Sequence, residues 1–251
     1  MKALALVLMM LASVAAAAPD ASKRPVARAG TDARTVETVP PAAPEQLAAF
    51  AAETTSLRPS LRPGAIVQRA MARRAERRKG QVCGDPDLQG DTVGFVPGRI
   101  NGCGIKEAVR LKSVSGVTLS QPALINCPTA RALKRWTEQS AQKVLRDKGG
   151  GLASYRVAAH YACRTRNNQP GARISEHGRG KAIDISGFVL RDGTTLTVLN
   201  DWNSKNGRAL KRMHREACGP FGTVLGPKSD RFHQDHFHFD TAKHRGGAYC
   251  R

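Results

Sequence analysis

The sequence has few aromatic residues, and this shortage narrows the range of partners. Aromatic side chains make up 5% of the 251 residues. A protein that recognises nucleic acid needs a base-stacking surface or a groove-reading module beside its positive charge, and the chain shows no such pattern. Nucleic acid is therefore not expected as a partner.

Long apolar runs are also missing, except at the N-terminus. Residues 1–18 contain a single lysine, an apolar core from Ala3 to Val14 and an alanine-rich end. This is the layout of a secretory signal peptide. The apolar part is shorter than the ~20 residues that a membrane-spanning helix needs. We therefore expect export to the periplasm or cell envelope, with no transmembrane segment after signal cleavage.

Acidic residues are half as frequent as basic ones. The chain has 40 Lys and Arg against 20 Asp and Glu, a formal net charge of +20. The excess continues through residues 83–251, which contain 27 basic and 14 acidic side chains. A positive field of this kind favours polyanionic partners. For an exported protein we expect peptidoglycan or another anionic cell-envelope polymer; the sequence does not indicate an oligomeric state.

Residues 19–80 lack the apolar content of a folded domain. They are rich in Pro, Ala, Arg and Thr and hold one aromatic residue, Phe50. Burial of so few apolar groups does not offset the entropy of ordering, which predicts a disordered linker. Within it, residues 45–54 and 65–79 have helical patterns. The second is strongly basic, and is either a helix that lies on an anionic surface or a solvated charge run.

Closely spaced cysteine pairs are absent, which excludes a cysteine-based zinc site. The six cysteines are far apart and all follow residue 80: Cys83, Cys103, Cys127, Cys163, Cys218 and Cys250. An even number in an exported chain indicates three disulfides, for which 15 pairings are possible. Together with the composition, they place a disulfide-braced domain at residues 81–251.

Two polar segments stand out in this domain, at residues 175–184 and 235–240. His177, Asp184 and His238 are ligands of the kind that zinc takes in hydrolytic sites, where three protein groups hold the metal and one position stays open. If both segments are extended, Asp184 and His238 face one side of a sheet while the apolar residues between them pack on the other. The glycines between His177 and Asp184 would let the loop approach a bound ion.

The first segment resembles a known signature. Ser-x-His-x-x-Gly-x-Ala-x-Asp is the metal-site pattern of the lysostaphin, D-Ala-D-Ala metallopeptidase and hedgehog-type zinc peptidases, and residues 235–239 resemble their Glu-x-x-His-Phe segment. Roughly residues 83–251 are similar to the bacterial extensin-like C-terminal domain family. The first resemblance implies Zn²⁺ as cofactor, His177, Asp184 and His238 as its ligands, and hydrolysis of peptidoglycan peptide bonds.

Three further residues are candidates for catalysis. A general base must lie within hydrogen-bond reach of the attacking water. Alignment on the Glu-x-x-His segment favours Asp235, whereas strand parity and the His-x-His members of the group favour His236, which we prefer. Arg164 lies near the position of a substrate-binding arginine in the D-Ala-D-Ala peptidases, offset by two residues; the alternative is a surface arginine.

The remaining pattern predicts an α+β fold, a small antiparallel sheet with packed helices like that of the hedgehog and D-Ala-D-Ala peptidases. After turn-rich sequence at 83–104, we expect strands at 107–114, 117–119, 155–163, 182–186, 194–199, 221–225 and 235–240, and helices at 128–148 and 208–218.

Other polar residues have simpler interpretations. Asp240 shares the ligand face and can orient a ligand histidine. Glu176 is expected to be solvated, and His160, His214, His233 and His244 to be surface or packing residues. Two alternatives to the peptidase remain open: a non-catalytic cell-wall-binding module that retains the metal pocket, and a structural envelope protein in which the three side chains only form hydrogen bonds.

Overall fold

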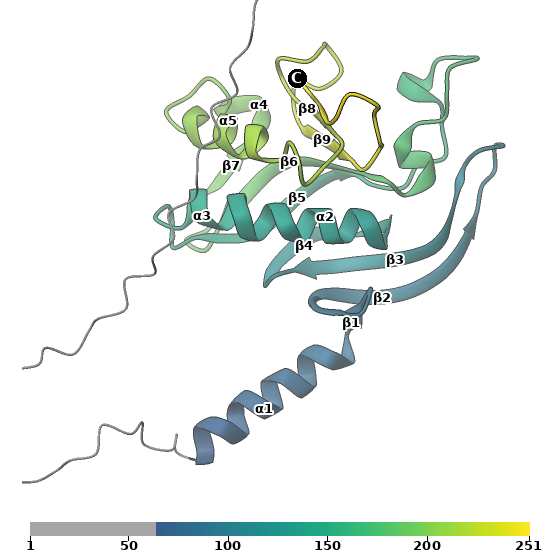
Figure 1. Cartoon of the computed structure of the whole chain (residues 1–251). Coiled ribbons are helices and arrows are strands. Elements are labelled where there is room, and N and C mark those ends of the chain that lie inside the picture. The colour runs from purple at the N-terminus through teal and green to yellow at the C-terminus, as the bar shows by residue number, and fades with distance from the viewer. Residues whose placement is uncertain (1–63) are drawn as a thin grey trace, which may run out of the picture. The chain divides into compact units, whose positions relative to one another are not determined.

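One mixed β-sheet of ten strands organises residues 64–251, the part of the chain that the structure, a computed structural model, describes (Figure 1). Nine strands follow the order β1-β2-β3-β4-β5-β6-β9-β8-β10, and β7 pairs with β6. The strands are β1 (Gln81–Val82), β2 (Asp85–Pro97), β3 (Gly104–Val114), β4 (Val117–Asn126), β5 (Leu152–Ala159), β6 (Ala182–Leu190), β7 (Thr195–Thr197), β8 (Thr223–Leu225), β9 (Phe237–Asp240) and β10 (Tyr249–Cys250). The α+β prediction is confirmed, but the sheet is not small.

The sequence predicts an antiparallel sheet, but two of the strand pairs are parallel. β4 pairs with β5 in parallel, and so does β8 with β10. A parallel neighbour needs a long crossover, and the helical segment between β4 and β5 supplies it. β10 is held beside β8 by the disulfide between Cys218 and Cys250.

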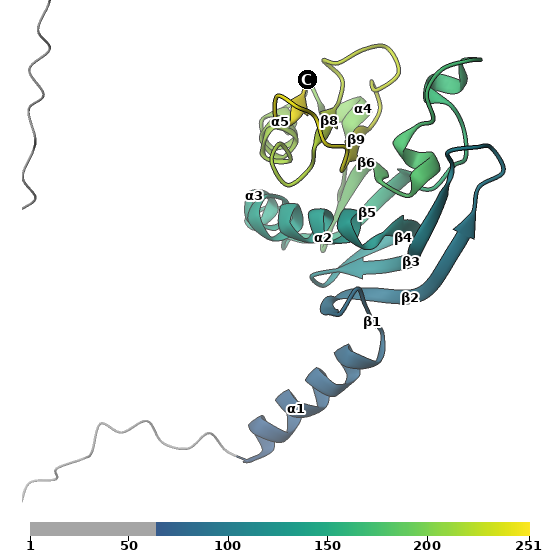
Figure 2. The ribbon, with the colours of Figure 1, turned by 45° about the vertical axis from the view of Figure 1, so that its right-hand side comes forward.

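The turn-rich interpretation of residues 83–104 is wrong for most of that stretch. Residues 85–97 form β2, which pairs with β3 through three register shifts. Glycine marks these irregularities; at Gly90 an added Cβ would lie 2.2 Å from the carbonyl oxygen of Arg110. The bulges and glycines break the alternation by which a strand is recognised. Figure 2 shows the long β2–β3 hairpin curving away from the rest of the sheet.

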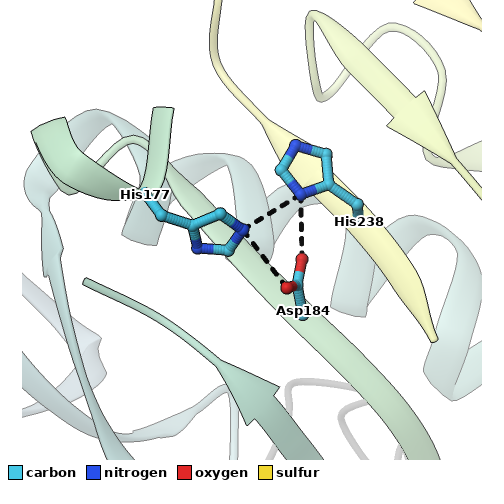
Figure 3. Close-up of side chains that lie close together, drawn as sticks. All are labelled: His177, Asp184 and His238. Atoms are coloured by element: carbon cyan, nitrogen blue, oxygen red, sulfur yellow. Dashed lines mark hydrogen bonds and ion pairs between the residues drawn. The ribbon is translucent and has the colours of Figure 1, made fainter. Parts of the chain in front are cut away.

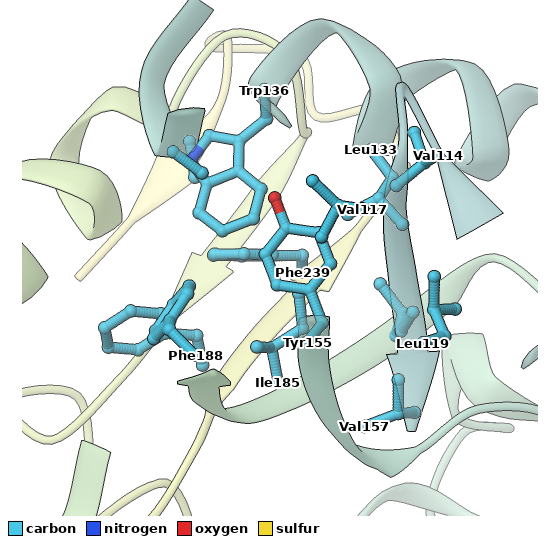
Figure 4. Close-up of a cluster of buried hydrophobic side chains, with 14 of the residues drawn as sticks. Val114, Val117, Leu119, Leu133, Trp136, Tyr155, Val157, Ile185, Phe188 and Phe239 are labelled. Carbon is cyan, nitrogen blue, oxygen red and sulfur yellow. The ribbon is translucent and has the colours of Figure 1, made fainter. Parts of the chain in front are cut away.

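The helical segment after β4 packs against one face of the sheet. α2 (Cys127–Trp136), a π-helical turn (Thr137–Ala141) and α3 (Gln142–Leu145) form the continuous helical segment that the sequence predicts. Asn126 caps α2 by accepting a hydrogen bond from the Thr129 amide. Trp136 is fully buried, stacks on Tyr155 and meets Phe239 edge-on, so it belongs to the core (Figure 4).

The second helical region contains α4 (Val198–Asp201) and α5 (Gly207–Glu216). The residue before α5 is Asn206, and its side chain does not cap the helix. Leu210 and Met213 of α5 enter the same core as α2. The indole N–H of Trp136 donates to the carbonyl of Met213 at 2.9 Å and joins the two helices.

Three disulfides brace the domain, as the cysteine count predicts. They join Cys83 to Cys127, Cys103 to Cys163 and Cys218 to Cys250. Each closes a loop of tens of residues, and such a bridge typically contributes about 2–4 kcal/mol to stability. Three disulfides suggest an oxidising location outside the cytoplasm.

The basic helix expected at residues 65–79 is present as α1 (Gly64–Lys79), and every one of its residues is at least partly exposed. It meets the sheet through an ion pair between Arg77 and Asp87. The predicted signal peptide and the helix expected at 45–54 lie outside the described residues. Among residues 64–251, no helix is both long and apolar enough to cross a membrane.

Candidate metal centre

The metal-ligand candidates converge at the centre of the sheet. β6 and β9 pair antiparallel, and their register places Asp184 directly opposite His238. Their apolar neighbours along both strands point into the core on the helix side. The Asp184 Oδ1 lies 2.9 Å from the His238 Nδ1, and both side chains are buried. Strand alternation therefore puts the two groups on the face opposite the helices, as the sequence predicts.

His177 approaches this pair from a short turn, η5 (Glu176–Arg179), that precedes β6 (Figure 3). Its Nε2 lies 3.2 Å from the Asp184 Oδ2 and 3.1 Å from the His238 Nδ1. One ligand atom from each of the three residues lies within 4.8 Å of the others. The group could therefore hold a metal ion.

The turn that carries His177 ends at a glycine, and its packing against neighbouring residues leaves no room for a side chain there. Gly180 has a left-handed φ of 63°, and an added Cβ would meet the side chain of Ile105 at 2.3 Å. A Cβ at Gly178 would likewise meet the Cys103 sulfur at 3.0 Å. Both glycines let the turn lie against β3 and its disulfide, whereas the sequence interpretation assigned them to the approach of the loop to an ion.

Hydrogen bonds on the outer side of each imidazole determine which nitrogen of the neutral ring carries the hydrogen. The His177 Nδ1 lies 2.7 Å from the carbonyl oxygen of His160, and the His238 Nε2 lies 3.1 Å from the Asp240 Oδ2. A carbonyl and a carboxylate accept, so each of these nitrogens carries the hydrogen. In the neutral rings, two nitrogen lone pairs then face the Asp184 carboxylate. Such a donor set requires a cation, which is either a proton or a metal, and it suits zinc.

The electrostatics of the metal-free site agree with this requirement. Burial favours the neutral forms of these groups, but their mutual hydrogen bonds and charges outweigh it. Burial alone would raise the pKa of Asp184, yet the hydrogen bonds from His177 and His238 hold it well below its usual range. Burial alone would lower the pKa of His238, yet Asp184 and Asp240 raise it to about 9. Without metal, a proton therefore occupies the site at neutral pH.

This proton predicts a pH-dependent zinc affinity. Zinc needs the lone pair at the His238 Nδ1 and must displace the proton there, while Asp184 is already ionised. We expect zinc affinity to rise by up to about tenfold per pH unit from pH 7 and to level off near the pKa of His238, about 9. Calorimetric titration in buffers of different ionisation enthalpy counts the released protons. Asp240→Asn should lower the pH at which affinity levels off; a pH-independent affinity would contradict the protonated site.

The two candidate bases form one hydrogen-bonded pair. The His236 Nδ1 lies 2.7 Å from the Asp235 Oδ1, and its Nε2 lies 3.6 Å from the Asp184 Oδ2. His236 is largely buried, with 16% of its side chain exposed, whereas Asp235 is 65% exposed. The imidazole thus faces the ligand cluster, and the carboxylate of Asp235 holds its outer nitrogen.

Arg164 borders the same cavity, a hollow of about 780 Å³. One of its guanidinium nitrogens donates to the carbonyl of Thr165 at 3.3 Å. The cavity is also lined by His233, whose Nδ1 lies 2.7 Å from the Asp230 Oδ1. This second aspartate–histidine pair was missed, although the spacing Asp-x-x-His just before His236 was a signal for it.

The expectations for the other polar residues had mixed outcomes. Glu176 is buried rather than solvated, and its Oε1 lies 3.3 Å from an Arg179 guanidinium nitrogen. His214 is a packing residue, as expected, against Trp202 and Phe237. His244 lines the cavity and lies 2.9 Å from the Thr223 hydroxyl.

Comparisons with known proteins add one result. Residues 95–251, well over half of the chain, match the family model described as the extensin-like protein C-terminus. Searches among curated proteins and among solved structures found no match. The family match covers both segments of the ligand cluster and five of the six cysteines. The chain therefore belongs to the family of the extensin-like protein C-terminus.

Proposed function

We propose that the protein is an exported zinc-dependent peptidase that hydrolyses peptide bonds of peptidoglycan. The observation that carries the proposal is the buried group of His177, Asp184 and His238, which could hold a metal ion and borders an open cavity. Side chains with a purely structural role could form the same mutual hydrogen bonds, but they would have no need of an opening to solvent. Here the three groups border a cavity that a substrate could enter.

The three ligands would hold zinc through the His177 Nε2, the Asp184 carboxylate and the His238 Nδ1. Bound zinc supplies Lewis acidity that polarises a peptide carbonyl and makes water nucleophilic near neutral pH. The protein's own residues orient the two ligand histidines. The carbonyl of His160 and the carboxylate of Asp240 fix the tautomers of the two ligand histidines, so both present a lone pair to the same point.

His236 is our candidate for the general base. Its Nε2 faces the ligand cluster and would accept the proton of the attacking water. Asp235 would act on His236 by stabilising the positive charge that the ring then carries. This arrangement assigns different roles to the two residues between which the sequence left a choice. Arg164, at the cavity edge, would steady the carbonyl or carboxylate of the bound peptide.

The substrate class follows from charge and compartment. Peptidoglycan peptides carry free carboxylates, and a basic protein attracts such a polymer. Three disulfides agree with an oxidising compartment where this polymer is found.

Digestion of purified sacculi tests the proposal. We expect zinc-loaded protein to release peptides or amino acids, which mass spectrometry identifies, and a chelator to stop the release. The products also name the bond. Stoichiometric zinc without any product would instead support the non-catalytic wall-binding module.

A further inference from the structure

A second hollow, which we call the basic groove, lies beside the metal cavity. It has a volume of about 900 Å³ and runs between α2 and the segment after β9. The basic groove includes four cationic side chains, Arg131, Arg135, Lys181 and Lys243, and no Asp or Glu. None of these four forms an ion pair with a carboxylate of residues 64–251. Their charge is therefore available to a ligand.

Two of the cations are oriented by the fold. Arg131 and Arg135 lie one turn apart on α2, and each donates one N–H to a backbone carbonyl. Arg131 bonds to the oxygen of Cys83 at 2.7 Å, and Arg135 to that of Pro220 at 3.2 Å. The remaining N–H groups of each guanidinium stay free for carboxylate oxygens. Less side-chain entropy is then lost when an anion binds.

The basic groove is continuous with other parts of the same surface. His244 lines both the groove and the metal cavity. Lys181 and Asn126 also line a smaller hollow of about 550 Å³, which includes Lys106, Arg179 and one acidic residue, Glu107. The basic groove thus adjoins both the metal cavity and this smaller hollow, which fits an extended chain better than a small ion.

We infer that the basic groove binds the carboxylate-bearing strand of peptidoglycan that flanks the bond in the metal cavity. The inference rests on the proposed function, because the polymer bound in the groove is the one whose peptide bond would be cleaved in the metal cavity. Charge complementarity identifies the occupant: spaced carboxylates along a flexible polymer match spaced, unpaired cations along an open groove.

Cosedimentation with purified sacculi tests this inference. All proteins are full-length mature chains that carry His236→Ala, so that turnover does not affect binding. We expect the groove variant Arg131→Gln/Arg135→Gln/Lys243→Gln to bind sacculi about tenfold more weakly, because each exposed ion pair contributes modestly and three are lost together. The control variant Lys143→Gln/Lys205→Gln/Arg208→Gln loses the same charge outside the groove and should stay within about twofold of the parent.

Two further binding measurements, on amidated sacculi and on lipid vesicles, identify the ligand. Sacculi whose carboxylates are converted to amides should bind the parent as weakly as the groove variant binds untreated sacculi. Equal losses in the groove and control variants, or undiminished binding to amidated sacculi, would overturn the inference. So would binding of the parent to phosphatidylglycerol vesicles but not to sacculi, which would make a lipid surface the occupant.

Folding of the variants is checked separately. Arg131→Gln and Arg135→Gln each remove a hydrogen bond to the backbone, so melting temperature and near-ultraviolet circular dichroism accompany the assay. If that variant is misfolded, Lys181→Gln/Lys243→Gln removes two groove charges and leaves those bonds in place, and a loss of less than about twofold would then overturn the inference. Sacculus binding without digestion by the unsubstituted protein would reject the peptidase and retain the groove.

Discussion

His236→Ala is expected to keep zinc and to lose turnover on sacculi by about 10²–10⁴-fold, the contribution typical of a positioned general base. The variant should retain zinc because the three proposed ligands, His177, Asp184 and His238, all remain. Zinc content by elemental analysis and product release by mass spectrometry separate the two effects. Asp235→Asn should cause a smaller loss, since the imidazole would remain while its carboxylate partner is neutralised.

His233→Ala is the matched control for this prediction. His233 lies in the same cavity and is also held by an aspartate, Asp230, at 2.7 Å. His236 approaches the Asp184 carboxylate, whereas the ion pair of His233 is with Asp230. We expect His233→Ala to reduce turnover less than His236→Ala. The reverse order would assign the base to His233, and unchanged turnover in both variants would exclude an imidazole base in this cavity.

Asp184→Ala is expected to abolish the zinc-dependent increase in stability. Zinc in excess of its dissociation constant by a factor of about 1,000 should stabilise the wild type by about 4 kcal/mol, whereas the variant should gain nothing. The metal-free variant should also be less stable than the metal-free wild type by about 3–5 kcal/mol, because His238 loses the buried anion that balances its proton. Thermal or denaturant unfolding with and without zinc measures both differences.

Asp147→Ala provides the control for this comparison. The Asp147 side chain is 85% exposed, and its ion pair is with Arg146 alone. We expect it to keep both the metal-free stability and the gain on zinc addition. If Asp184→Ala gains as much from zinc as the wild type does, the group of His177, Asp184 and His238 is not the zinc site.

Hydrophobic periodicity predicted the secondary structure of segments that have one apolar side and one polar side. The strand around Asp184, the strand around His238 and the helical segment after Pro128 were all predicted, because alternation or helical spacing separates the apolar side of a segment from its polar side. It failed at β2, where bulges at glycines interrupt the pattern, and at the two parallel pairings, which depend on crossovers that no local pattern encodes.

Some features of the candidate site lie beyond any local pattern. The carbonyl of His160 orients His177, but every residue has a carbonyl, so its identity there carries no signal. Glu176 is buried although charged residues usually lie at the surface, because the turn folds it against Arg179. The pairing of the cysteines was open for the same reason: spacing along the chain does not determine distance in space.

The sequence by itself determined the residue types of a cluster that could hold a metal ion, the two segments that carry them, the number of disulfides and the basic character of the domain. These are properties of composition and short-range spacing, which survive without knowledge of long-range contacts. Only the tertiary structure decided that His177 meets Asp184 and His238, that His236 and Asp235 form one pair, and that unpaired cations line a groove beside them. Those facts depend on strand register and on packing between distant segments, which are set by the whole fold at once.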